Sequence, residues 1–264
     1  MFNDLFSGPK RAQAIVAVLC AAATASAMAI PKLQLDAVPG VYVAGTDETI
    51  YATQPKFDLY AYFYPGGDNN GNGFDPVIGD LFNLSMAVVP GTSVGIDYGS
   101  FTIDTDKINV TSQMTCQAGQ ACPGTPQELP GHGIFPTFFL QKEFLFDPAN
   151  KAVPYNTADK SGSGPTAAAA GEPFMYFQKF VIDATELVKN DVSGLHFDLY
   201  VYGEKCNGGE TGTECSIVLA KAPFSHDVEY SRDGVPPAET PEPGSLALLG
   251  IALAGVAFAR RRAA

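Results

Sequence analysis

The sequence predicts an all-β protein, an antiparallel β-sandwich of the jelly-roll or immunoglobulin-like kind with long loops. Short alternating or aromatic-rich stretches recur between turn signals, and no long helical pattern separates them. The chain of 264 residues contains 27 glycines and 20 prolines, which supply turns. Charged residues make up only 17% of it, against about 25% in an average soluble domain. Together these observations indicate a β-rich exported protein.

The clearest strand pattern lies between Phe57 and Phe63, where Phe57, Leu59, Ala61 and Phe63 share one face. A period of two is typical of a half-buried strand. About ten strands are expected, and stretches of this character cover residues 48–52, 56–63, 81–89, 98–104, 137–146, 174–183, 195–203 and 215–220.

Three further features organise the body of the chain. Asp183 and Glu186 have the spacing of a capping box, which predicts one short helix. The segment 156–171, rich in Ser, Gly, Pro and Ala, predicts a flexible loop. We expect a signal peptide at 1–29, one β-sandwich domain at 30–234, a Pro-rich spacer at 235–240 and a terminal segment at 241–264.

The N-terminal segment predicts a secretory signal peptide. Two basic residues at positions 10 and 11 precede an apolar stretch over 12–25, which is too short to span a bilayer comfortably. Ala27 and Ala29 form an A-x-A-like cleavage site, so cleavage is expected after Ala29, with Ile30 as the first mature residue. The Sec export machinery is then a partner. The alternative is an uncleaved N-terminal anchor.

The C-terminal segment predicts a single transmembrane helix that is marginal as a permanent anchor. The uncharged run 245–259 reaches about 22 Å as a helix, against about 30 Å of hydrocarbon. Arg260, Arg261 and Arg262 follow it and should hold the end in the cytoplasm by the positive-inside rule. A core helix would not usually be apolar on all sides.

Pro241, Glu242 and Pro243, the apolar run and the arginine cluster together resemble the PEP-CTERM sorting signal. The resemblance covers the last two dozen residues. It implies export, transient retention in the inner membrane, and processing by exosortase, a membrane transpeptidase that recognises the Pro-Glu-Pro region. The implied destination is the cell surface or the extracellular space of a Gram-negative-type bacterium.

The body of the chain resembles the N type of the choice-of-anchor families, exported bacterial proteins that carry alternative sorting tails. The resemblance covers most of residues 33–202. It implies a β-rich surface domain without a defined biochemical role. The matching stretches are LQLD, DETIYA, FDLYAYF, YGSFTI, INVTSQM, LPGHGIFPTFF and FDLYVYG.

Four cysteines remain after signal cleavage: Cys116, Cys122, Cys206 and Cys215. Three pairings are open, and the short spacings favour Cys116 with Cys122 and Cys206 with Cys215. An oxidising compartment favours disulfides. The alternative, a zinc site, would need C-x2-C-like spacing, which the sequence lacks.

One Gly-rich stretch resembles the first half of a calcium loop. Asp68, Asn70 and Asn72 alternate ahead of Gly73, as in D-x-[DN]-x-[DN]-G. The twelfth position is glycine rather than a bidentate Glu, so Asp75 or Asp80 would have to substitute. The alternative is a polar turn between strands without calcium, which the sequence favours.

The sequence carries no nucleophile elbow, zincin or phosphate-binding motif, and no catalytic residue is predicted. His132, His196 and His226 are interpreted as surface or turn residues. The net charge of −12 disfavours nucleic-acid partners. We therefore expect a non-enzymatic surface or matrix protein. The alternative is a carbohydrate-binding or adhesive module for extracellular polysaccharide, with sugar-stacking rings at Tyr60, Tyr62, Tyr200 and Tyr202.

Overall fold

A computed structural model describes residues 29–44, 48–68, 74–89, 97–110, 113–116, 138–187, 194–209, 212–223 and 226–235. Within them the chain forms fourteen β-strands and no α-helix. The strands are β1 (Leu33–Val38), β2 (Gly40–Val43), β3 (Thr49–Ala52), β4 (Lys56–Phe63), β5 (Phe82–Val89), β6 (Ser100–Ile103), β7 (Asp106–Asn109), β8 (Thr115–Cys116), β9 (Phe138–Phe144), β10 (Lys151–Ala152), β11 (Met175–Asp183), β12 (Gly194–Gly209), β13 (Gly212–Lys221) and β14 (Val228–Ser231).

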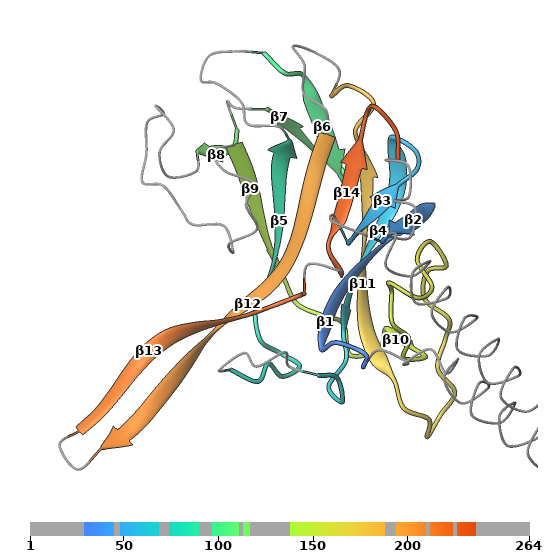
Figure 1. The fold of residues 1–264 in the computed structure, drawn as a ribbon. Coiled ribbons are helices and arrows are strands. Elements are labelled where there is room, and N and C mark those ends of the chain that lie inside the picture. The colour runs from blue at the N-terminus through green and yellow to red at the C-terminus, as the bar shows by residue number, and fades with distance from the viewer. Residues whose placement is uncertain are drawn as a thin grey trace, which may run out of the picture.

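The strands form two sheets (Figure 1). The six-stranded sheet has the order β1-β4-β11-β6-β7, with β10 paired to β11. The eight-stranded sheet has the order β2-β3-β14-β12-β5-β9-β8, with β13 paired to β12. Each of the eight predicted strand stretches coincides with a strand of the structure.

The hydrophobic core lies between the two sheets. The predicted inward face of β4, from Phe57 to Phe63, is buried there as expected. Leu84 of β5 and Phe197 of β12 meet it from the eight-stranded sheet. Alternate residues of both sheets thus bury one face against the other, which confirms the predicted β-sandwich.

One strand pair departs from the predicted antiparallel arrangement. β14 pairs with β3 in parallel, with Val228 opposite Ile50 and Tyr230 opposite Ala52. All other strand pairs among the described residues are antiparallel. β3 and β14 are far apart in the chain, so no tight hairpin constrains their relative direction.

The β12–β13 hairpin projects from the sandwich as a two-stranded ribbon (Figure 1). The N-terminal part of β12, residues 194–201, pairs with β5. The register of β12 with β13 runs from Tyr200 opposite Lys221 to Gly209 opposite Gly212. The distal part of the ribbon therefore has no third strand in the described structure.

The predicted helix at Asp183 is wrong. Asp183 ends β11, and the residues after it form a turn, with the Leu187 N–H donating to the Ala184 carbonyl at 3.0 Å. The Asp183 carboxylate does accept the Thr185 N–H at 3.0 Å, as a cap would. It also pairs with Lys56 on the neighbouring strand at 2.8 Å, which lowers the pKa of Asp183 to about 2. The same local hydrogen bond closes an Asx-type turn, so a capping pattern alone does not specify a helix.

Candidate functional site

The loop predicted over 156–171 is an irregular segment that packs against the outer face of the six-stranded sheet. The Thr157 N–H donates to Gln34 Oε1 of β1 at 3.0 Å, and the Tyr42 N–H of β2 donates to Ser161 Oγ at 2.7 Å. Gly162 has φ +74°, and a Cβ there would lie 2.2 Å from the Gly40 carbonyl oxygen. Only glycine permits this close approach.

Asp36 of β1 lies under this loop and binds it through hydrogen bonds. Its carboxylate accepts the Gly162 N–H at 2.8 Å and the Gly164 N–H at 3.4 Å. The Tyr155 hydroxyl donates to the same carboxylate at 3.2 Å and lies 2.6 Å from the Tyr62 hydroxyl. Burial raises the pKa of Asp36 to about 6, although these hydrogen bonds act to lower it. A carboxyl buried under the loop thus changes charge near neutral pH.

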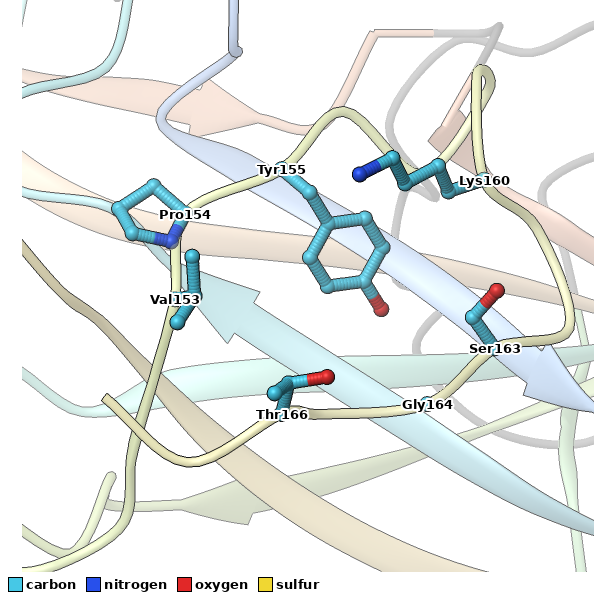
Figure 2. A pocket seen from close by; sticks show the side chains of 7 residues that line it. All are labelled: Val153, Pro154, Tyr155, Lys160, Ser163, Gly164 and Thr166. Atoms are coloured by element: carbon cyan, nitrogen blue, oxygen red, sulfur yellow. The ribbon is translucent and has the colours of Figure 1, made fainter. Parts of the chain in front are cut away.

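A pocket of about 220 Å³ opens between the two arms of this loop, and Figure 2 shows the Tyr155 ring between them. Lys160 and Thr166 extend toward the ring from opposite arms. The pocket is lined by Val153, Pro154, Tyr155, Lys160, Ser163, Gly164 and Thr166. One aromatic face, two hydroxyls and an ammonium suit a small polyhydroxylated or anionic ligand. The residues that line it include no histidine, cysteine or carboxylate.

The four tyrosines predicted to stack on sugar rings do not form one surface. Tyr62 and Tyr200 are fully buried, so the prediction is wrong for them. Tyr62 is buried because its ring packs edge-on against Tyr155 of the covering loop, with centroids 5.4 Å apart. Tyr60 is half-buried, and Tyr202 is exposed with its ring edge-on to Tyr200. Both faces of β4 are therefore covered. The period-two pattern had instead predicted a strand with only one face buried.

Three possible ligands of the predicted calcium loop lie within the described residues: Asp68, Asp75 and Asp80, whose carboxylate accepts the Val77 N–H at 2.8 Å. The Asp75 carboxylate is 2.5 Å from the Lys32 ammonium, which also donates to the Pro65 carbonyl at 3.1 Å. Asp68 forms an isolated bridge with Pro31 and accepts the Lys32 N–H through its backbone carbonyl at 2.8 Å. Asn70 and Asn72 lie outside the described residues. A calcium ion bound by Asp75 would have to compete with the buried ammonium of Lys32.

Three of the four cysteines lie in described strands. Cys206 of β12 and Cys215 of β13 are directly opposed partners in the ribbon. This register brings their Cα atoms within the range that a disulfide bridges. Cys116 pairs with Phe138 in the β8–β9 ladder, and Cys122 lies outside the described residues. The local pairing of Cys206 with Cys215 thus stays a prediction that the register supports.

Sequence reasoning missed a buried cluster of one imidazole and three carboxylates. His196 Nε2 lies 3.4 Å from Asp198 Oδ1 and 3.4 Å from Asp227 Oδ2, and His196 Nδ1 lies 3.8 Å from Glu229 Oε2. His196, Asp198 and Asp227 offer ligand atoms within 4.8 Å of one another. Burial alone would lower the pKa of His196, but the carboxylates raise it to about 10. The H-x-D spacing on a strand was the signal that could have found it.

His226, the neighbour of Asp227, is held away from this cluster. Its Nε2 lies 2.9 Å from Asn156 Oδ1, and burial lowers the pKa of His226 to about 4. His196 and His226 are both buried, so neither is a surface residue, but His226 does lie in a turn, since its backbone N–H donates to the Pro223 carbonyl at 2.9 Å. His132 lies outside the described residues.

The predicted processing residues fall mostly outside the described part of the chain. Ala27, Pro241, Glu242, Pro243 and Arg260, Arg261 and Arg262 lie outside it, as does the apolar run 245–259. Ala29 is exposed, and the Ile30 carbonyl accepts the Asp68 N–H at 2.9 Å, so regular pairing begins beside the expected cleavage point. Of the residues described, none form a helix with the length and apolar character to cross a bilayer.

Comparison with known proteins identifies the tail. The family model of the PEP-CTERM protein-sorting motif matches residues 239–262. No curated protein and no solved structure matches the chain. The resemblance of the body to the choice-of-anchor N type is not confirmed and stays a prediction.

Proposed function

Because the chain is a PEP-CTERM protein, which implies export and processing by exosortase, we propose that it is a non-enzymatic protein of the cell surface or extracellular matrix. Its β-sandwich would be the part delivered, and its tail would be a temporary anchor in the inner membrane. The sorting motif at 239–262 is the observation that carries this proposal.

The position of the motif relative to the fold supports delivery of an intact domain. The last strand of the described residues, β14, ends at Ser231, and the motif begins at residue 239. Cleavage near Pro241 to Pro243 would therefore remove none of the fourteen described strands.

Cell fractionation of a motif variant tests the proposal. Replacing Pro241, Glu242 and Pro243 by alanine should move the protein from the surface or medium to the inner-membrane fraction. The matched control replaces Pro236 and Pro237, two prolines just outside the motif, and should be processed normally. An unchanged distribution of the motif variant would refute exosortase sorting.

The pocket favours a second candidate function, binding of extracellular polysaccharide. Its Tyr155 ring, its Ser163 and Thr166 hydroxyls and the Lys160 ammonium are the groups that sugars and their anionic substituents contact (Figure 2). A glycan array should show binding that the double variant Lys160→Ala/Thr166→Ala loses. Lys107→Ala, at an exposed lysine on β7, should retain it. No bound glycan, or equal binding by both variants, would reject this function.

A further inference from the structure

We propose that His196, Asp198 and Asp227, supported by Glu229, form a binding site for a divalent transition cation of the zinc class. The proposal is independent of the sorting tail and of the pocket. It concerns the outer face of the eight-stranded sheet, opposite the face that enters the core.

Strand geometry brings the four side chains together. His196 and Asp198 are two apart on β12 and therefore share one face. Glu229 of β14 is the direct partner of His196 across the ladder, and Asp227 precedes it by two residues. The intervening residues Phe197 and Val228 enter the core, so the cluster occupies the other face. The Asp227 carbonyl accepts the Ile50 N–H at 3.3 Å, which holds its backbone in place.

The distances suit ligands of a common ion. Both contacts of His196 Nε2, at 3.4 Å, are longer than the 2.7–3.2 Å of an ordinary N–H···O hydrogen bond. Donor atoms placed about 2.0–2.1 Å from a tetrahedral zinc ion lie roughly 3.3–3.4 Å apart. A cation near the three ligand atoms of His196, Asp198 and Asp227 would therefore need little movement of the side chains.

The two ring nitrogens of His196 have different surroundings. Nε2 faces the carboxylates of Asp198 and Asp227, whereas Nδ1 faces Glu229 at 3.8 Å. Histidines that bind metal through one nitrogen commonly donate the other N–H to a carboxylate, which fixes the tautomer. Glu229 lies on that side of the ring, and at 3.8 Å it would have to move closer to accept the Nδ1–H.

Burial and charge also favour a cation. His196 and Asp198 are each 4% exposed and Asp227 is 3% exposed. Burying carboxylates side by side is costly unless a counter-charge compensates them, and a bound cation supplies one. One imidazole with carboxylates is a donor set for zinc and related ions, whereas calcium prefers oxygen ligands alone. The cation would link β14 to β12.

Zinc titration of the full mature protein tests the site. The protein is first treated with chelator and its thiols are alkylated, so that the cysteines cannot bind metal. Calorimetry should show one equivalent of zinc bound, and a hundredfold excess over Kd should raise the Tm by roughly 5–10 °C. No binding by this protein would overturn the proposal.

Variants distinguish a metal site from a metal-free ion-pair network of imidazolium and carboxylates. Asp198→Asn and His196→Gln should abolish zinc binding and, with it, the rise in Tm that zinc produces in the wild-type protein. Asp36→Asn, at a buried carboxyl of the other sheet, should bind zinc normally. If Asp198→Asn still binds zinc, or loses Tm equally with and without metal, the site is structural and the proposal fails.

Cobalt provides a readout that does not depend on the folding of a variant. Co²⁺ added to the alkylated wild-type protein should give the intense visible absorption of a four-coordinate ion. The weak spectrum of aqueous cobalt, unchanged by the protein, would contradict the site.

Discussion

Phe63 of β4 and Phe82 of β5 face each other across the sandwich, with ring centroids 5.4 Å apart. Phe63 also contacts Phe146 at 6.0 Å and stacks on Tyr176 at 6.1 Å. Phe63, from the six-stranded sheet, thus belongs to a cluster of aromatic rings that extends to the opposite sheet.

Removing this ring should destabilise the whole sandwich. Phe63→Ala is expected to lower the free energy of unfolding by about 3–5 kcal/mol, because Phe63 is 1% exposed and its neighbours would line a cavity. Urea unfolding followed by circular dichroism measures this loss. Val181→Ala, at an exposed position of β11, is the control and should cost far less. Equal small losses for both variants would contradict the described core.

Asp36 should make stability fall as pH rises from about 4 to 6. Its pKa of about 6 in the folded protein lies above the ordinary aspartate value of 3.8, so the native state holds this proton more tightly than the unfolded chain. The contribution is complete below about pH 4 and is lost as pH rises through 6. The difference between these two pKa values corresponds to at most about 3 kcal/mol of the free energy of unfolding.

Asp36→Asn should flatten this part of the pH profile, so that its Tm gains on the wild type between pH 4 and 7. Thermal unfolding at several pH values measures the difference. Asp233→Asn, at an exposed turn after β14, should follow the wild-type curve. Parallel curves for Asp36→Asn and the wild type would exclude a proton-linked role for Asp36.

Cys206 and Cys215 should form a disulfide across the β12–β13 ribbon, because the register makes them direct partners. Peptide mapping under non-reducing conditions should recover this pair cross-linked. The closed loop is short, so its reduction should cost at most about 3 kcal/mol and act mainly on the ribbon. Recovery of Cys206 linked to Cys116 or Cys122 would show that the ribbon register is wrong.

Calcium should bind weakly or not at all at the Asp68 to Asp75 loop of the wild-type protein. The Lys32 ammonium, 2.5 Å from Asp75, places a positive charge beside the carboxylate that the ion would need. Calorimetry should give no heat, and chelator should leave the Tm unchanged. A millimolar or tighter Kd for calcium would contradict this expectation and support the calcium site considered from the sequence.

The strands of the core could be predicted because their pattern is local. Phe57 to Phe63 alternates clearly, and each predicted stretch forms a strand. β1 also alternates, with Leu33, Leu35 and Ala37 inward, but it was not identified as a strand in its own right. β8 and β10 have two residues each, too few for a period to be distinct.

The sites could not be predicted because they join residues distant in the chain. Asp36 and Gly162 meet through a loop that covers β4, and no local pattern indicates which strand such a loop will cover. Half of the histidine–carboxylate cluster could be predicted, since His196 and Asp198 share a strand face. Its other half depends on β14 lying beside β12, which only the sheet order reveals.

Intact-mass measurement of the protein from cells with and without exosortase shows whether the tail sorts this protein. With the enzyme, we expect a chain that begins at Ile30 and ends near Pro241 to Pro243. Without it, the chain should retain the arginine cluster and remain in the membrane fraction. A chain that keeps residues 245–262 in both strains would contradict sorting by this tail.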